Sequence, residues 1–71
     1  MNKAALKAKM IINGDTGIML ARALNISETT FSAKMNGKSE FTRSEIAKIK
    51  TRYHLSADEV DEIFFNNLVT Y

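Results

Sequence analysis

The 71-residue sequence contains no cysteine, no proline and no tryptophan, and only one histidine. Without cysteine the chain can form neither a disulfide nor a thiolate metal site, which fits a reducing cytoplasm. The lack of proline, with 45% apolar and 25% charged residues, indicates a globular helical protein and not a disordered chain. We expect a single domain over residues 1–71, near the lower size limit for a self-sufficient core.

Long apolar runs and alternating patterns are also missing. No stretch approaches the roughly 20 apolar residues that span a bilayer. The N-terminal MNKAALKAKMIIN mixes lysine with alanine and lacks the apolar run of a secretory signal. We therefore expect a cytoplasmic protein that makes no membrane contact. Because no useful length alternates with period two, we expect no sheet.

Residue types that carry catalysis or bind metal are scarce. His54 is the only histidine and has no cysteine to accompany it, which argues against a metal site or histidine-based catalysis. We interpret the acidic run Asp58, Glu59, Asp61 and Glu62 as a solvated helix start, favoured by the helix dipole, and not as a cation site. No glycine-rich phosphate loop or nucleophile motif is present. We expect no enzyme, no catalytic residue, no metal, no cofactor and no small-molecule ligand.

Positive charge is absent from the last part of the chain. Residues 1–52 hold all ten Lys and Arg and four acids, a net charge of +6. Residues 53–71 hold four acids and no Lys or Arg, a net charge of −4. This division is compatible with solvated helix faces, and it also suits an anionic partner that approaches one side of the molecule.

Apolar spacing and capping signals predict five helices, namely 3–12, 17–24, 28–35, one through Tyr53 and one through Phe64. Asp15 or Thr16, then Ser27, Thr42 and Ser56, are suitable N-caps. Thr42-Arg-Ser-Glu and Ser56-Ala-Asp-Glu both have the spacing of a capping box. In the first helix we expect Leu6 and Met10 on the buried face, with Ala5 and Ile12 alongside.

The helix over 28–35 separates its side chains in an unusual way. On a helical wheel Glu28, Thr29, Ser32, Ala33 and Asn36 share one arc, while Phe31 and Met35 point away from it. Short polar side chains on the outer arc let a partner approach the backbone closely. The major groove of DNA admits one such helix. An unremarkable amphipathic helix would show the same pattern, so the helix alone does not decide between the two.

The segment 16–38, TGIMLARALNISETTFSAKMNGK, resembles the helix-turn-helix of the lambda-type phage repressor, Cro and XRE-like regulator family. The shared features are Leu20-Ala21, Leu24, Asn25 in place of the usual Gly, Ile26-Ser27, Thr30-Phe31 and Asn36-Gly37-Lys38. The resemblance extends over nearly the whole chain. It implies an all-α, compact five-helix, lambda-repressor-like DNA-binding domain with the motif at about 16–36.

The resemblance also implies which residues meet DNA. Base edges would be contacted by Glu28, Thr29, Ser32 and Ala33, and phosphates by Thr16, Gly17, Asn36, Lys38 and Arg43. Several positions depart from the family pattern. Gly17 stands where Gln is usual, so a side-chain phosphate contact is lost there, and Lys34 occupies a position that is commonly apolar. Met10 and Met35 replace an Arg and a Glu that often pair in the family, and we expect these two methionines to be in contact.

The C-terminal EIFFNNLVTY is more apolar than a solvated tail requires. It either packs back on the first helix or is buried in a second subunit. For the second case the dimer contacts would be Phe65, Leu68, Val69 and Tyr71, with the tail 66–71 at the interface.

The sequence therefore predicts a transcriptional regulator of phage or prophage Cro or repressor type. It would bind a double-stranded DNA operator, as a homodimer at least on DNA. The alternative is a protein-binding module on the same fold, such as an antirepressor. The two differ in what they require around the helix over 28–35, because a DNA reader needs a basic rim there.

Overall fold

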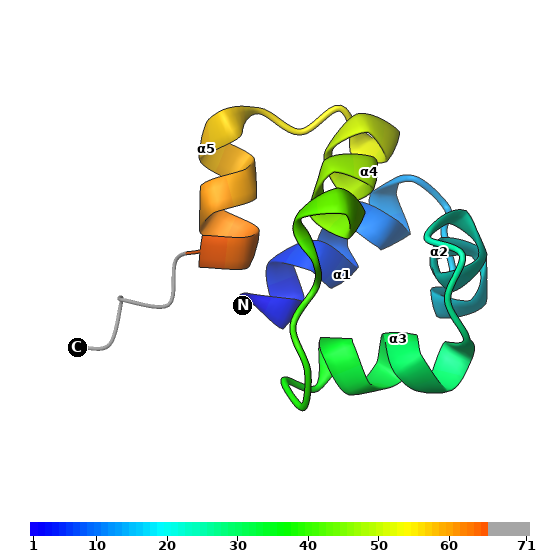
Figure 1. Ribbon diagram of the computed structural model, residues 1–71. Coiled ribbons are helices and arrows are strands. Elements are labelled where there is room, and N and C mark those ends of the chain that lie inside the picture. The colour runs from blue at the N-terminus through cyan, green and yellow to red at the C-terminus, as the bar shows by residue number, and fades with distance from the viewer. Residues whose placement is uncertain (66–71) are drawn as a thin grey trace.

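The computed structural model describes residues 1–65 and confirms the all-helical prediction (Figure 1). No strand occurs in this part of the chain. The helices are α1 (Lys3–Ile12), α2 (Gly17–Ala23), α3 (Glu28–Met35), α4 (Arg43–Tyr53) and α5 (Ala57–Val60), which continues into the π-helical turn η1 (Asp61–Phe65). Helix α2 ends one residue earlier than expected, with Leu24 as its C-cap, and the wider π turn was not predicted.

The helices begin where short-range hydrogen bonding predicts. The side chains of Thr16, Ser27, Thr42 and Ser56 each accept a hydrogen bond from the backbone N–H three residues later. Both predicted capping boxes are complete, because the glutamate at the third helical position also accepts from the backbone of its cap. Thr16, and not Asp15, therefore caps α2.

Helices α1 to α4 end in the same left-handed turn. A residue with positive φ follows the C-cap of α1, α2 and α3, with 70° at Gly14, 60° at Asn25 and 80° at Gly37, and forms the C-cap of α4, with 53° at His54. In each turn two amides donate back to carbonyls of the last helical turn, as in the Schellman motif. Only glycine adopts this conformation without steric cost, so Asn25 and His54 are slightly strained.

The core contains the apolar residues expected from the helical spacing. Leu6, Leu20, Ile49 and Ile63 are fully enclosed. Around them lie Met10, Ala21, Leu24, Phe31, Met35, Phe41, Tyr53 and Leu55. Met10 and Met35 thus belong to one cluster, and their direct contact stays a prediction. The expectation for Ile12 was wrong: its side chain is 76% exposed, because the helix ends there and turns away from the core.

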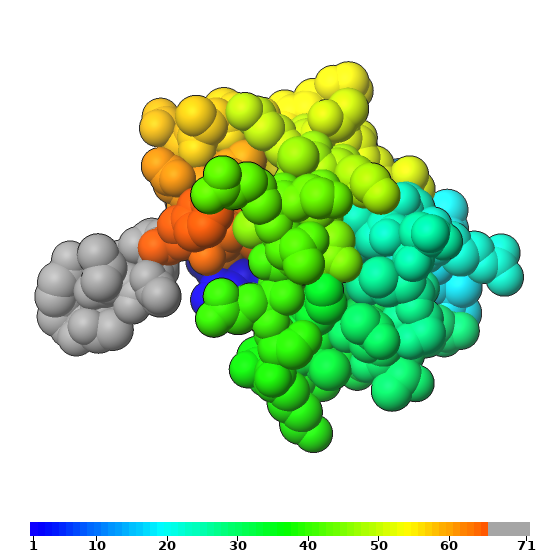
Figure 2. All heavy atoms as spheres, viewed as in Figure 1, coloured from blue at the N-terminus to red at the C-terminus, as the bar shows by residue number. Residues whose placement is uncertain are grey.

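Helix α3 lies along one edge of the molecule, at the bottom of Figure 1, with the other helices above it. It packs against α2, to which the short turn over residues 24–27 connects it. The space-filling view shows that the segment after α3 projects furthest from the body on this side (Figure 2). The fold therefore leaves the outer face of α3 open to a partner.

Candidate functional site

Hydrogen bonds within residues 27–38 define both ends of helix α3. Ser27 caps the start, accepting from the Thr30 amide at 3.1 Å. At the other end the Gly37 amide donates to the Lys34 carbonyl at 3.3 Å, and the Lys38 amide donates to the Ala33 carbonyl at 2.9 Å. The helix thus ends at Met35, with Asn36 as its C-cap, although a lysine occupies position 34.

The inner face of α3 anchors it to the rest of the domain. Phe31, Lys34 and Met35 are buried, as the wheel predicts for the first and the last. The ring of Phe31 contacts that of Phe41 edge to face, with centroids 6.1 Å apart. A Cβ at Gly17 would lie 3.4 Å from Phe31 Cε2, so the start of α2 lies directly against this ring. The start of α2 and the buried face of α3 are thereby fixed relative to each other.

The outer face of α3 is hollowed. A shallow depression of about 450 Å³ is lined by Glu28, Thr29, Ser32, Ala33, Asn36 and Lys38. Every lining residue except the half-buried Ala33 is exposed. The structure thus brings together all four residues predicted to contact bases and two of the five predicted to contact phosphates. Among the lining side chains, Glu28 is acidic and Lys38 is basic.

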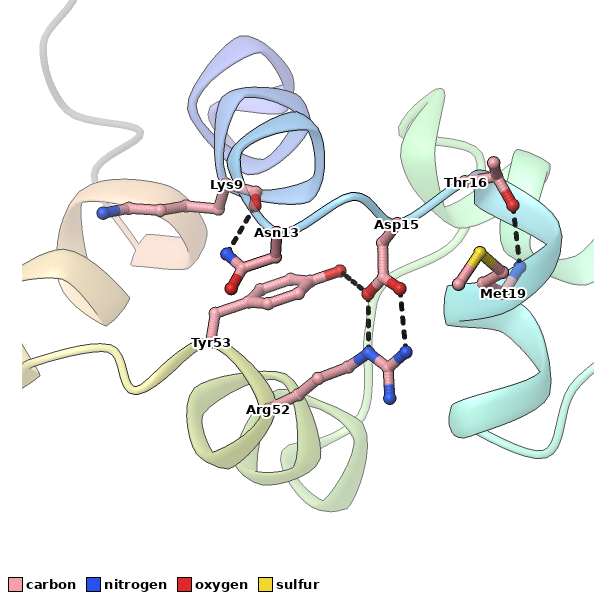
Figure 3. Close-up of polar contacts among 7 residues, drawn as sticks. All are labelled: Lys9, Asn13, Asp15, Thr16, Met19, Arg52 and Tyr53. Carbon is pink, nitrogen blue, oxygen red and sulfur yellow. Dashed lines mark hydrogen bonds and ion pairs between the residues drawn. The ribbon is translucent and has the colours of Figure 1, made fainter.

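The other three predicted phosphate contacts lie elsewhere. Thr16 is exposed at the cap of α2, where its hydroxyl accepts from the Met19 amide at 3.2 Å (Figure 3). Gly17 is half-buried against Phe31 and offers only its backbone. Arg43 is exposed as the first residue of α4 and does not line the depression. Gly17, and with it Thr16, is therefore positioned next to α3, and the phosphate contact of Arg43 stays a prediction.

One polar residue beside the depression was missed from the sequence. The Lys3 ammonium, at the start of α1, donates to Asn36 Oδ1 at 2.7 Å. Its partner lies 33 positions away in the chain, and no local pattern distinguishes this lysine from the others in the first helix. Lys3 and Lys38 thus place positive charge at the C-terminal end of α3.

Lys34 is buried and paired. Its ammonium donates to Glu45 Oε1 at 2.5 Å, and the two side chains are only 9% and 10% exposed. The same oxygen accepts from the Thr42 amide at 2.9 Å, so Glu45 both caps α4 and neutralises Lys34. Burial raises the pKa of the Glu45 carboxyl, but the hydrogen bonds from Lys34 and Thr42 outweigh it and hold the pKa below its ordinary value.

A second polar cluster ties the α1–α2 connection to the end of α4 (Figure 3). Asp15 accepts two hydrogen bonds from the Arg52 guanidinium, at 2.6 and 2.8 Å, and one from the Tyr53 hydroxyl at 2.6 Å. The hydrogen bonds from Arg52 lower the pKa of Asp15, and burial raises the pKa of Tyr53 far above its usual range. This cluster orients the start of α2, and with it Thr16 and Gly17.

The four phenylalanines form a continuous row from α3 to the end of the described chain. Phe41 contacts Phe64 edge to face at 5.8 Å between centroids, and Phe64 lies 6.5 Å from Phe65. Phe64 is partly buried against the core, whereas Phe65 is 56% exposed. The other predicted dimer contacts, Leu68, Val69 and Tyr71, lie outside the described residues.

The remaining acidic and apolar features of residues 1–65 bear on two possibilities, a metal site and a membrane span. Within this range no group of three or more His, Asp or Glu side chains could hold a metal ion. Glu59, from the acidic run of α5, forms an ion pair with Lys9 and completes its capping box. No helix in the described part of the chain is long and apolar enough to cross a bilayer.

Comparison with known proteins assigns the chain to a family without assigning an activity. No curated protein and no solved structure matches it. A family model does match, over residues 2–67, which is nearly the whole chain. The protein therefore belongs to the family described as "Protein of unknown function (DUF739)".

Proposed function

We propose that this protein is a sequence-specific double-stranded DNA-binding regulator of Cro or repressor type, in which α2 and α3 form a helix-turn-helix. The observation that carries the proposal is the depression on α3. Its lining is made of short polar side chains, and its C-terminal end carries Lys3 and Lys38. An α-helix face of this kind fits the width of the major groove, where hydroxyls and amides reach base edges.

In this proposal Glu28, Thr29, Ser32 and Ala33 meet bases. Phosphates are met by Thr16, Gly17, Asn36, Lys38 and Arg43. The contact of Phe31 with the start of α2 supports the arrangement, because it holds both sets of residues on one side of the molecule. Phosphate contacts by cations fix the register on DNA, and contacts to base edges carry the specificity.

The proposed binding unit on DNA is a symmetric dimer. A single α3 offers few base contacts, and two subunits would read half-sites with centres about 34 Å apart, one helical turn. The exposed ring of Phe65 at the end of η1 supports a contact between subunits there. Removal of residues 67–71 is expected to weaken cooperative binding without unfolding the domain, as judged by gel-shift stoichiometry and circular dichroism.

A protein-binding module on the same fold, such as an antirepressor, is the second candidate. Ile11 and Ile12 favour it, because each side chain is 76% exposed at the end of α1 and a solvated helix end does not require them. Such a module would use this apolar surface and would not need the hydroxyls of α3.

Selection of bound sequences from random duplex DNA separates the two candidates. A DNA regulator enriches a symmetric motif, and its affinity falls with salt. If six phosphates are neutralised, log affinity against log salt has a slope of about −5. Lys38→Ala should weaken all sequences alike and reduce that slope by about one for each bound subunit, whereas Thr29→Ala should change preference at one or two base pairs. Failure to enrich any sequence, with flat affinity across salt, would exclude the DNA proposal.

A further inference from the structure

Lys3 at the start of α1 and two residues one turn apart at the end of α3, Ser32 and Asn36, form a hydrogen-bonded row. Lys3 Nζ donates to Asn36 Oδ1 at 2.7 Å, and Asn36 Nδ2 donates to Ser32 Oγ at 3.4 Å. The start of α1 lies close to the C-terminal end of α3 in Figure 1. In Figure 2 the dark-blue N-terminal atoms are visible between the segment after α3 and the C-terminal helix.

The direction of these bonds follows from the chemistry of the groups. A lysine ammonium has three donors and no acceptor, so the amide oxygen of Asn36 must face Lys3. The amide nitrogen then faces Ser32, whose oxygen must accept. Asn36 occupies one of the two lone pairs of the Ser32 oxygen, which reduces its capacity to accept and leaves the hydroxyl hydrogen to donate. Ser32 lines the depression on the outer face of α3.

We propose that the row Lys3–Asn36–Ser32 makes Ser32 a hydrogen-bond donor toward DNA, so that this position selects a base-edge acceptor. The major-groove acceptors are N7 of either purine, O6 of guanine and O4 of thymine. The inference rests on the proposed function and deepens it. It also assigns Lys3 to the interface, where its remaining N–H groups are available to a phosphate. Asn36 acts as the positioning residue between them.

The test compares four single variants with the wild type by selection from random duplex DNA. Ser32→Ala removes the donor, Asn36→Ala removes the link, and Lys3→Met removes the first member. Lys7→Met is the matched control, because Lys7 is exposed one turn further along α1 and its substitution removes the same charge. Circular dichroism checks that each variant is folded.

If the row acts as proposed, Ser32→Ala, Asn36→Ala and Lys3→Met relax preference at the same base pair, and Lys7→Met leaves it unchanged. Lys3→Met also reduces the salt slope by about one for each bound subunit. Where the preferred base is a purine, replacing its N7 by carbon is a second probe. If N7 is the acceptor, this change in the DNA should weaken binding by the wild type and leave binding by Ser32→Ala unaffected. Unchanged wild-type binding would assign the contact to O6 or O4.

The outcomes separate the two proposals. If the wild type enriches no sequence, the proposed function fails and the inference fails with it. If the wild type enriches a motif but Lys3→Met behaves like Lys7→Met, the row is overturned while the DNA-binding function stands. A Ser32 position that prefers a base-edge donor, such as the amino group of cytosine, would likewise overturn the inference alone.

Discussion

The burial of Lys34 leads to a sharp prediction about stability. Its ammonium and the Glu45 carboxylate are each about nine-tenths enclosed and hydrogen-bonded to each other. Lys34→Met would keep the length of the side chain and its contact with Phe41, over whose ring the ammonium lies at 5.9 Å. It would leave the Glu45 charge buried without its counter-ion.

Removing one partner of a buried pair costs roughly 3–5 kcal/mol. Glu45 retains one hydrogen bond, from the Thr42 amide, so we expect the lower part of that range, about 3–4 kcal/mol. A domain of this size is stable by roughly 4–10 kcal/mol, so the loss is a large fraction of the total. The double variant Lys34→Met/Glu45→Gln keeps an acceptor for Thr42 and has no charge to bury. It should recover most of the loss.

Urea unfolding followed by circular dichroism at neutral pH measures these differences. Lys48→Met is a suitable control, because Lys48 is exposed on α4 and its loss should change stability by less than about 0.5 kcal/mol. A Lys34→Met variant as stable as the control would refute the reasoning. So would a double variant less stable than Lys34→Met, because the cost could not then come from a stranded charge.

Three further outcomes are expected. His54→Gly removes the side chain from a residue in the left-handed conformation and should raise the free energy of unfolding by about 1 kcal/mol, measured in urea. Asn25→Gly should gain less, because asparagine tolerates this conformation. A lower stability of His54→Gly would contradict the left-handed turn. The pKa of Asp15 is lower in the folded protein than its unfolded value of 3.8, so the ionised carboxylate stabilises the fold above that value and the stabilisation is lost as pH falls through the folded pKa. Asp15→Asn should therefore be less stable near neutrality, and its thermal stability should fall less steeply between about pH 5 and pH 2. Parallel stability curves for the variant and the wild type would contradict this. Gly17→Gln should fit against Phe31 and tighten DNA binding through a new phosphate contact, whereas Gly17→Ala, the matched control, should not; equal affinities of the two variants would exclude that contact.

Helix ends were predictable from the sequence because the interactions that set them are local. A serine or threonine cap bonds to an amide three residues later, and the turn after a helix bonds within six residues. Thr42, Ser56 and the Asn36-Gly37 stop could therefore be recognised without knowledge of the fold. The outward arc of α3 was also correct, because Phe31 and Met35 fix which side faces the core.

The polar contacts that position the candidate site could not be predicted in the same way. Lys34 and Glu45 are 11 residues apart, Lys3 and Asn36 are 33 apart, and Asp15 and Arg52 are 37 apart. Which charges meet over such separations depends on how the helices pack. An amphipathic pattern says that position 34 faces inward, but it does not say that a buried lysine there will find a carboxylate.

The structure also changes what the charge of the sequence means for a DNA partner. Of the ten cations in residues 1–52, Lys9, Lys34 and Arg52 are used in ion pairs within the described part of the chain. At the depression on α3 the positive charge comes from Lys38 in its lining and from Lys3 beside it. The acids that pair with Lys34 and Arg52 are already subtracted in the net charge of +6, so only the pair of Lys9 with Glu59 lowers it. At the depression itself one subunit offers two cations, and each of their phosphate contacts would carry a correspondingly large share of the affinity. Two subunits would double that number while reading two half-sites, so the proposed DNA-binding function depends on the proposed symmetric dimer more than it would with a continuous basic rim around each α3.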